Sequence, residues 1–215
     1  ATAVWEGCYT HFYSADLEDD ATTAAQWKEF TEAVEQLKPE EGNLIHACNG
    51  AAAMRYPSFA AGAVRPGIFL YGGRIGGGVA VPEEVARVRA RVTLIRDVPV
   101  ATTLGYGATY RSSGDERWAT LGIGYGDGFP RVLGNRGSAL LFGRRVPIIG
   151  RISMDMTVVD ITGDDRVGVG DTATLIGTDG DVSITLDDVA HLAGTISYEI
   201  LTGFTARMPR VWITE

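Results

Sequence analysis

The stretch "PEEVARVRARVTLI", residues 82–95, marks the point where the organisation of this chain changes. On its amino-terminal side, short apolar segments alternate with segments of helical periodicity. On its carboxyl-terminal side, helical patterns become rare and short β-rich segments follow one another. The sequence therefore predicts an α/β part followed by an all-β part, with domains at residues 1–79 and 80–215.

The first part repeats a strand-then-helix pattern. Its apolar segments are "WEGCYTHF" (residues 5–12), "NLIHAC" (residues 43–48) and "VRPGIFLYGG" (residues 64–73). Between the first two segments, Trp27, Phe30, Val34 and Leu37 recur at helical spacing, and residues 51–60 begin the next cycle. A βαβα order of this kind implies parallel strands joined by helical crossovers.

The second part reads as a mostly β domain. Its β-rich runs, separated by Gly and Asp turns, are "WATLGIGYG" (118–126), "SALLFG" (138–143), "RVPIIGRISMDMTVVDI" (145–161) and "DTATLIG" (171–177). Within the third run, strand alternation would place Met154, Met156 and Val158 on one face. One helix is predicted after Thr185, where Asp188 would complete a capping box and Gly194 would end the helix.

The first part is too short to be a complete parallel barrel. A closed barrel takes eight βα units and typically about 250 residues, whereas about 79 residues hold three cycles here. An open parallel sheet of three strands would be small and poorly covered. We therefore expect this part either to pack against another chain or to be a portion of a larger domain.

Composition excludes several classes of function. The net charge of −8 and the pI near 4.9 argue against a nucleic-acid partner and against an anionic membrane surface. No apolar run approaches the roughly 20 residues of a membrane span, and the first residues carry no secretion-signal pattern, so we expect a cytoplasmic protein. Cys8 and Cys48 stand far apart and without zinc-ligand spacing, which indicates reduced thiols and no metal site.

Several polar side chains stand where a site could form, although each has an ordinary structural explanation. Tyr106 and Tyr125 are each flanked by glycine, which suits either a strand end or a ligand that needs room to reach the hydroxyls. Arg65 interrupts an apolar run, so it either faces solvent at a strand edge or meets an acceptor inside. His11 and His46 are expected at the carboxyl ends of successive strands, where parallel folds place their sites.

The motifs taken together, in their order along the chain, indicate a family resemblance that no single motif establishes. "YTHF", "IHACNGAAAMRYP", "VRPGIFLYG", "GYGATY", "IGYGDGFPR", "GRISMDM" and "SYEILTGFTARMPRVW" together resemble the carboxyl-terminal part of alanine racemase, a pyridoxal-phosphate enzyme. The resemblance runs from about residue 5 to residue 213. It implies the carboxyl-terminal part of a (β/α)8 barrel followed by a β-rich domain. It also implies a head-to-tail homodimer with shared active sites.

The resemblance assigns catalytic roles to two residues. Tyr106 matches the family's base on the L-alanine face, which reaches into the site of the partner subunit. A phenol with an ordinary pKa of about 10 is a poor base near neutrality and needs help from its neighbours. The residue that matches His11, in the partner subunit, is its hydrogen-bond neighbour.

Other matched residues would bind pyridoxal 5'-phosphate and the substrate. Arg65 matches the arginine that faces the pyridine nitrogen, and His46 matches the histidine that braces it. Because a guanidinium does not give up its proton readily, the ring would stay unprotonated, which discourages side reactions. The remaining matches are the backbone amides of Gly67 and Ile68 and the phenol of Tyr198 at the phosphate, the backbone of Met154 at the substrate, and Tyr125 at the entrance.

The chain departs from the family pattern at two places. Gly50 in "HACNG" stands where a serine hydroxyl normally binds the phosphate, so its amide could still serve but cofactor affinity is expected to be weaker. The family's lysine that bonds the cofactor, and the arginine that meets the substrate carboxylate, belong to an amino-terminal barrel portion that has no counterpart here. Lys28 and Lys38 do not resemble that lysine motif.

The resemblance implies interconversion of L- and D-alanine by two bases, which supplies D-alanine for peptidoglycan. We expect the isolated 215 residues to be inactive. Three alternatives stay open: a racemase of broader specificity, for example for serine; a non-catalytic interaction module; and, less well supported, a decarboxylase of related architecture. The joint presence of Tyr106, His11, Arg65 and Tyr198 argues against a mere scaffold.

Overall fold

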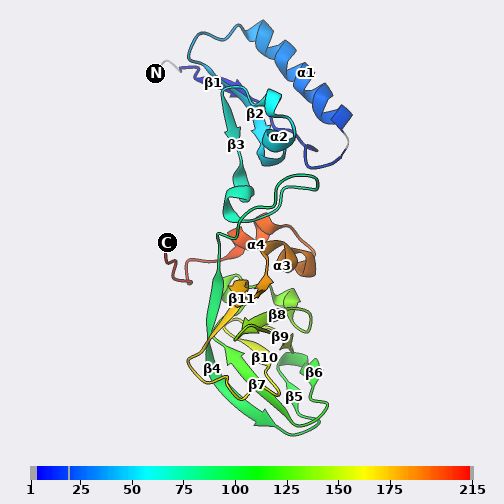
Figure 1. The fold of residues 1–215 in the computed structure, drawn as a ribbon, viewed down its shortest axis with the longest axis vertical. Helices are drawn as coiled ribbons and strands as arrows, with labels where there is room; N and C mark the ends of the chain where they lie inside the picture. The colour runs from blue at the N-terminus through cyan, green and yellow to red at the C-terminus, as the bar shows by residue number, and fades with distance from the viewer. Residues whose placement is uncertain (1–3, 19, 214–215) are drawn as a thin grey trace. The chain divides into compact units, whose positions relative to one another are not determined.

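The computed structural model describes residues 4–18 and 20–213. The chain divides after Glu83 into two compact units, unit 1 with residues 1–83 and unit 2 with residues 84–215 (Figure 1). Within the described residues, no helix is both long and apolar enough to cross a membrane.

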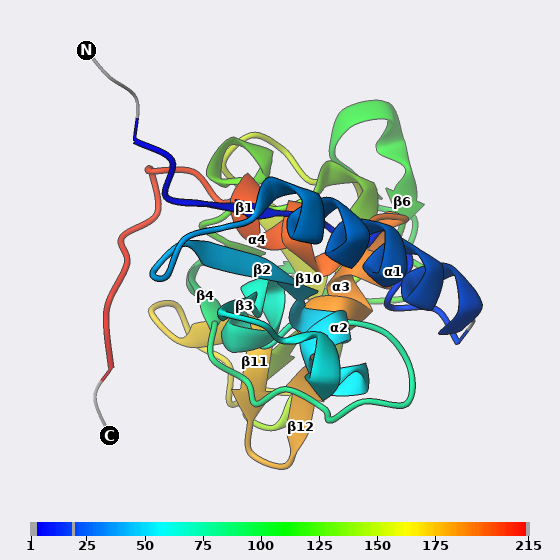
Figure 2. The same cartoon turned by 90° about the horizontal axis from the view of Figure 1, so that it is seen from above.

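Unit 1 is built from a small parallel sheet. Its elements are β1 (Gly7–Tyr9), α1 (Asp20–Leu37), β2 (Leu44–Asn49), α2 (Gly50–Arg55), η1 (Pro57–Phe59), β3 (Ala63–Arg65) and η2 (Gly67–Tyr71). The sheet order is β1-β2-β3 with both pairings parallel, and β2 lies between its neighbours (Figure 2). The predicted βαβα pattern with parallel strands is confirmed.

Aromatic rings attach α1 to the rest of unit 1. The Trp27 ring stacks on Phe59 with centroids 4.8 Å apart, and it also meets Phe12 at 6.5 Å. Phe12 is almost completely buried, as are Ala47 and Cys48 of β2. Leu37, which helical spacing placed on the same apolar face, is instead exposed at the end of the helix. The core of unit 1 is therefore small, and α1 contributes to it mainly through Trp27.

Unit 2 consists mostly of strands. These are β4 (Val88–Val98), β5 (Thr103–Leu104), β6 (Tyr110–Arg111), β7 (Glu116–Leu121), β8 (Ser138–Leu141), β9 (Arg144–Ile149), β10 (Thr157–Asp160), β11 (Thr172–Asp179) and β12 (Val182–Ile184). The helices are η3 (Tyr106–Ala108), η4 (Tyr125–Asp127), η5 (Arg131–Leu133), α3 (Leu186–Ala193) and α4 (Ser197–Gly203). The β-rich texture predicted for the second part is confirmed.

The large sheet of unit 2 closes on itself. Its order is β12-β11-β4-β7-β10-β9-β8 with antiparallel pairings, and β11 also pairs with β8, where Thr174 lies opposite Leu140. The strands from β11 round to β8 therefore form a barrel, and closure leaves few open edges. Trp118, Leu140 and Leu175 are among the fully buried side chains. The stretch 82–95 supplies β4, in which Val88, Ala90 and Val92 alternate with exposed residues, as a half-buried strand requires.

The strand predicted through "GRISMDM" begins later than alternation suggested. β10 starts at Thr157, and residues 150–156 form no strand. The Ser153 amide donates to the Met156 carbonyl at 2.9 Å, and the Ser153 hydroxyl accepts from the Met156 amide at 3.1 Å. This local turn competes with strand pairing. The prediction that Met154 and Met156 share a strand face with Val158 is therefore wrong.

The carboxyl-terminal region contains two helices among the described residues, where one was predicted. The capping box of α3 is confirmed, because Thr185 accepts from the Asp188 amide and Asp188 accepts from the Thr185 amide. Gly194 ends α3 with a φ of 73°, as predicted. The additional helix α4 has seven residues, which is too short for a periodic apolar signal, and its Ser197 hydroxyl bonds Asp187 of α3.

Candidate active site

Arg65, at the end of β3, is the centre of a polar cluster in unit 1. Its guanidinium contacts His46 Nδ1 at 2.5 Å and donates to the carbonyls of Thr10 and Ala47 at 2.9 and 3.0 Å. Because a guanidinium has donors alone, His46 Nδ1 must be the acceptor in this pair. Arg65 therefore meets acceptors inside the unit, and the alternative of a solvent-facing arginine is wrong.

The two histidines occupy different places relative to their strands. His46 is the third residue of β2 and lies opposite Tyr9 of β1, so its predicted position at the carboxyl end is wrong. β2 continues to Asn49 because Asn49 pairs with Arg65 of β3. His11 does follow the end of β1, and it is exposed, with its Nδ1 3.4 Å from Arg65 Nη2.

Two neighbours of this cluster were missed at the level of sequence. The Tyr9 ring stacks on His46 with centroids 5.2 Å apart, and the Arg65 guanidinium lies over the same ring at 5.4 Å. Asn49 accepts from the Ala52 amide at 3.0 Å, which caps α2, and donates to the Phe12 carbonyl at 3.1 Å. The alternation of β1 could have indicated Tyr9, since it places Tyr9 and His11 on one side of the chain.

Gly50 and Gly67 differ in the space around them. A Cβ atom at Gly50 would lie 2.6 Å from the Pro66 carbonyl oxygen, so the backbone approaches closely there. At Gly67, φ is +56° and no described heavy atom lies within 4 Å of where a Cβ would be. Gly67 and Ile68 begin η2, and the first amides of a helix lack partners within it. Space is therefore open beside the Cα atom of Gly67, at the start of η2.

Tyr106 stands on the turn that connects β5 and β6 in unit 2, and 74% of its surface is exposed. Gly105 and Gly107, on either side, have φ values of 67° and 74°, a region that side chains with a Cβ rarely adopt. A Cβ at Gly107 would also lie 3.0 Å from Arg151 Nη1. The flanking glycines are therefore required by the shape of the turn that presents the phenol.

Tyr125 and Met154 are brought together by backbone hydrogen bonds. The Tyr125 amide donates to the Ser153 carbonyl at 3.0 Å, and the Gly126 amide donates to the Met154 carbonyl at 2.8 Å. A Cβ at Gly124 would lie 2.3 Å from the Ser153 carbonyl oxygen, so glycine is needed for this approach. Both side chains are about half-exposed.

An ion-pair network beside this region was also missed. Arg207 lies 3.3 Å from Asp127 and 2.5 Å from Asp155, residues that belong to η4 and to the turn after Met154. The hydrogen bond that Arg207 donates to Asp155, together with the charge of Asp127, raises the pKa of Arg207. The sequence held no local signal for this network, because its members are 28 or more residues apart.

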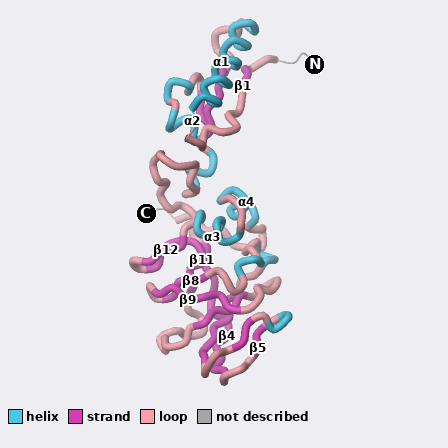
Figure 3. The backbone as a smooth tube through the Cα atoms, turned by 90° about the vertical axis from the view of Figure 1, so that its right-hand side faces the viewer, coloured by secondary structure: helices cyan, strands magenta, loops and turns pink. Residues whose placement is uncertain are grey.

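Tyr198 belongs to α4 and is about half-exposed. Within unit 2, α3 and α4 lie at one end, and the β5–β6 pair lies at the other (Figures 1 and 3). The candidate residues thus form four groups: Arg65, His46 and His11 with the neighbouring glycines in unit 1, Tyr106 on the β5–β6 turn, Tyr125 with Met154, and Tyr198 on α4.

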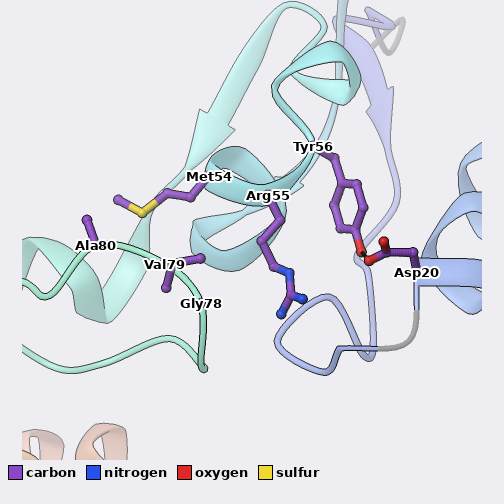
Figure 4. Close-up of a pocket in the computed structure, with 7 residues that line it drawn as sticks. All are labelled: Asp20, Met54, Arg55, Tyr56, Gly78, Val79 and Ala80. Atoms are coloured by element: carbon purple, nitrogen blue, oxygen red, sulfur yellow. Dashed lines mark hydrogen bonds between the residues drawn. The ribbon is translucent and has the colours of Figure 1, made fainter.

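A pocket in unit 1 lies apart from these groups. It is lined by Asp20, Met54, Arg55, Tyr56 and residues 78–80, and the Tyr56 hydroxyl points toward Asp20, to which it donates a hydrogen bond (Figure 4). That bond raises the pKa of Tyr56. The lining includes none of the residues that sequence motifs indicated. The described residues also contain no cluster of three or more groups that could hold a metal ion.

The structure combines an α/β unit that holds an inward arginine–histidine pair with a closed antiparallel barrel that displays tyrosines on turns. These features define a two-part class of proteins, with an α/β part followed by a β-rich part. Sequence models of the alanine racemase amino-terminal and carboxyl-terminal domains match residues 2–75 and 85–212. The chain belongs to the alanine racemase family.

The relatives support the same assignment. Alanine racemases of Carboxydothermus hydrogenoformans and Methanococcus maripaludis are 40% and 38% identical, each over 97% of this chain and 58% and 57% of their own lengths. A Bacillus anthracis alanine racemase structure with bound L-Ala-P has a TM-score of 0.89 at 35% identity and covers 97% of this chain. A Bartonella henselae alanine racemase with covalently bound pyridoxal phosphate has a TM-score of 0.86 at 31% identity, again over 97% of this chain.

The chain therefore spans just over half the length of the relatives it matches, 55% and 56% of those two structures. The predicted family and the predicted fold class, the carboxyl-terminal part of a barrel followed by a β-rich domain, are confirmed by these matches.

Proposed function

We propose that this chain contributes to an alanine racemase that interconverts L- and D-alanine with pyridoxal 5'-phosphate. The observation that carries the proposal is the Arg65 cluster, in which the guanidinium is turned inward and held by two carbonyls and His46. The family assignment supplies the substrate class, and the product D-alanine would serve peptidoglycan synthesis. No specific contact favours a serine racemase, a decarboxylase or an interaction module over this function.

The residues of unit 1 fit the cofactor. The hydrogen bonds of Arg65 use its two terminal nitrogens, and within the described residues no acceptor bonds Nε. This N–H is available for the ring nitrogen, and the amides of Gly50, Gly67 and Ile68 together with Tyr198 would hold the phosphate. When bound, pyridoxal phosphate supplies an electron sink that acidifies the α-hydrogen of an amino acid. Arg65 keeps its own proton and holds the ring nitrogen by a hydrogen bond.

Tyr106 would exchange the α-proton on the L-face. Its turn presents the hydroxyl to solvent, so in a single copy the phenol reaches outward. We propose that it enters the site of a second copy, where His11 is its neighbour. The positions of α4 and the β5–β6 pair at opposite ends of unit 2 support this arrangement, because one site would then take Tyr198 from one copy and Tyr106 from the other (Figures 1 and 3).

The base on the D-face would come from the amino-terminal barrel portion. Lys28 forms an ion pair with Glu32 at 3.8 Å on the exposed surface of α1, and Lys38 is exposed just after that helix. Neither lysine belongs to the Arg65 cluster. We therefore propose that the 215 residues alone do not racemise alanine and do not bond pyridoxal phosphate covalently.

The test is α-proton exchange in deuterated water, measured on the full-length protein and its Tyr106→Phe variant. Wild type should exchange the α-proton of both alanine enantiomers and racemise alanine faster than serine. Tyr106→Phe should lose exchange from L-alanine by about 10²- to 10⁴-fold, the usual contribution of a general base, and should retain exchange from D-alanine. Absence of alanine racemisation by wild type would refute the proposed function. Equal loss from both enantiomers would refute the role of Tyr106.

A further inference from the structure

The turn that carries Tyr106 is attached to the barrel by short strands. β5 and β6 have two residues each, and they pair with one another rather than with the barrel sheet. Such a pair is marginally stable alone. Contacts from outside the pair must therefore fix the position of the phenol.

Glu116 provides one such contact, to the first residue of β6. Glu116 is 8% exposed, and its carboxylate accepts from the Tyr110 hydroxyl of β6 at 3.0 Å and from the indole N–H of Trp118 at 2.8 Å. The other carboxylate oxygen accepts from the Ser113 amide at 2.9 Å. Burial and the bond to Glu116 raise the pKa of Tyr110 to about 12, so this phenol stays a donor at neutral pH. The Tyr110 ring also packs edge-on against Trp118, with centroids 5.9 Å apart.

Asn135 provides a second contact at the last residue of the turn, Thr109, directly before β6. Its side-chain nitrogen donates to the Thr109 carbonyl and to the Thr109 hydroxyl, both at 3.3 Å, and Thr109 is three residues beyond Tyr106. Its side-chain oxygen accepts from the Gly150 amide at 2.6 Å. Asn135 thus joins the end of the turn to the end of β9, beside the Arg151 side chain that packs against Gly107.

We propose that Glu116 and Asn135 are positioning residues that hold the Tyr106 turn where it joins β6, Glu116 through Tyr110 and Asn135 through Thr109. The proposal rests on the proposed function, in which the Tyr106 hydroxyl exchanges the α-proton of L-alanine. Neither residue would touch the substrate. A displacement of about 1 Å at a reacting group can cost about 10²-fold in rate, so tethers of this kind affect proton transfer more than binding.

The contact between Asn135 and Thr109 is tested with Asn135→Asp in the full-length enzyme. Aspartate keeps an acceptor for the Gly150 amide and tolerates the φ of 58° at this position, but it loses both donors to Thr109. Exchange from L-alanine should fall about 10- to 100-fold, the range that a sub-ångström to 1 Å displacement gives. Exchange from D-alanine and the KM for either enantiomer should change less than about threefold, since neither depends on the turn.

The contact between Glu116 and Tyr110 is tested with Tyr110→Phe, which removes the hydroxyl that donates to Glu116 and keeps the ring that packs on Trp118. The same asymmetry between enantiomers is expected. The matched control is Asp179→Asn, which weakens a comparable side-chain tie, from Asp179 to the Gly143 amide at 3.1 Å in another turn of the barrel. This control should lower thermal stability without creating asymmetry.

Four outcomes separate the possibilities. Selective loss of L-alanine exchange in Asn135→Asp and Tyr110→Phe supports the proposal. Parallel loss from both enantiomers, accompanied by a lower melting temperature, would show a merely structural role and would overturn it, as would unchanged exchange in both variants. If the wild-type protein exchanges the α-proton of neither enantiomer, the proposed function fails. This failure is distinct from a failure of the positioning roles, because it is measured on wild type before any variant is compared.

Discussion

Gly50 is the residue at which this chain departs from the family's phosphate-binding pattern, and packing explains why a side chain does not fit there. The Pro66 carbonyl oxygen has approached to 2.6 Å of where a Cβ would stand. Pro66 lies between Arg65 and Gly67, so a side chain at position 50 that displaced Pro66 would also displace these two candidate site residues. The absence of a serine hydroxyl at position 50 therefore accompanies the close approach of the Pro66 backbone.

We predict that Gly50→Ser does not strengthen cofactor binding. The added Cβ must displace backbone, which should lower the free energy of unfolding by about 1–3 kcal/mol, the usual cost of overpacking. Gly77→Ser is the matched control, because no described heavy atom lies within 4 Å of its Cβ position and its φ is not positive. Thermal unfolding and titration with pyridoxal phosphate measure both effects. Tighter binding at unchanged stability would contradict the packing explanation.

Some residue-scale features could be predicted from sequence and others could not. The interruption of an apolar run by Arg65 posed a choice between solvent and an internal acceptor, and the structure selects the acceptor. The distance between His46 and the end of its strand could not be predicted. The pairing of β2 with β1 ends at His46, but β2 continues to Asn49 because it also pairs with β3. The same limit applies to Asn135 and Glu116, whose partners are fixed by tertiary structure.

Elements with a local signal were predictable, and elements that depend on distant contacts were not. The α3 capping box is contained within four residues, from Thr185 to Asp188, and it was found. α4 has no capping hydrogen bond from the side chain of its N-cap, Ile196. The turn at Ser153 interrupts a sequence that alternates as a strand would. In both missed cases the contacts that are present, from Ser197 to Asp187 and between Ser153 and Met156, are not encoded by alternation.

The element that contains Glu116 should make the stability of unit 2 depend on pH. Burial alone would raise the pKa of Glu116, but hydrogen bonds from Trp118, Ser113 and Tyr110 outweigh burial and hold this pKa below its ordinary value of 4.5. A lowered folded-state pKa means that the stabilisation is present above about pH 4.5 and is lost as the pH falls through the folded value.

Glu116→Gln should be less stable than wild type at pH 7, because an amide N–H₂ group would face a donor in this network, at a cost of about 1–3 kcal/mol. The difference between the two proteins should shrink as the pH falls below about 4.5, where the unfolded state takes up a proton first, and through the lower pKa of the folded carboxylate. Urea unfolding of both proteins from pH 7 to pH 3 measures the difference. A constant difference across this range would contradict the charged role of Glu116.

At the scale of the whole molecule, the closed barrel and the parallel unit belong to one family, and the chain covers just over half of its relatives' length. The sequence already indicated that the first part is too short to form a barrel alone. Sequence order could not show that α4 and the β5–β6 pair lie at opposite ends of unit 2 (Figures 1 and 3). That separation underlies the proposal that two copies complete each site.

The most direct test of this central claim is complementation between two inactive full-length variants, Tyr106→Phe and Arg65→Gln. If one copy gives Arg65 and the other gives Tyr106, a mixed dimer contains one intact site. Co-expression with two affinity tags isolates the pair, and alanine racemisation is then measured. The isolated mixed dimers should have about half of wild-type activity, because each has one intact site of two. Mixed dimers that are as inactive as either parent would contradict a site shared between copies.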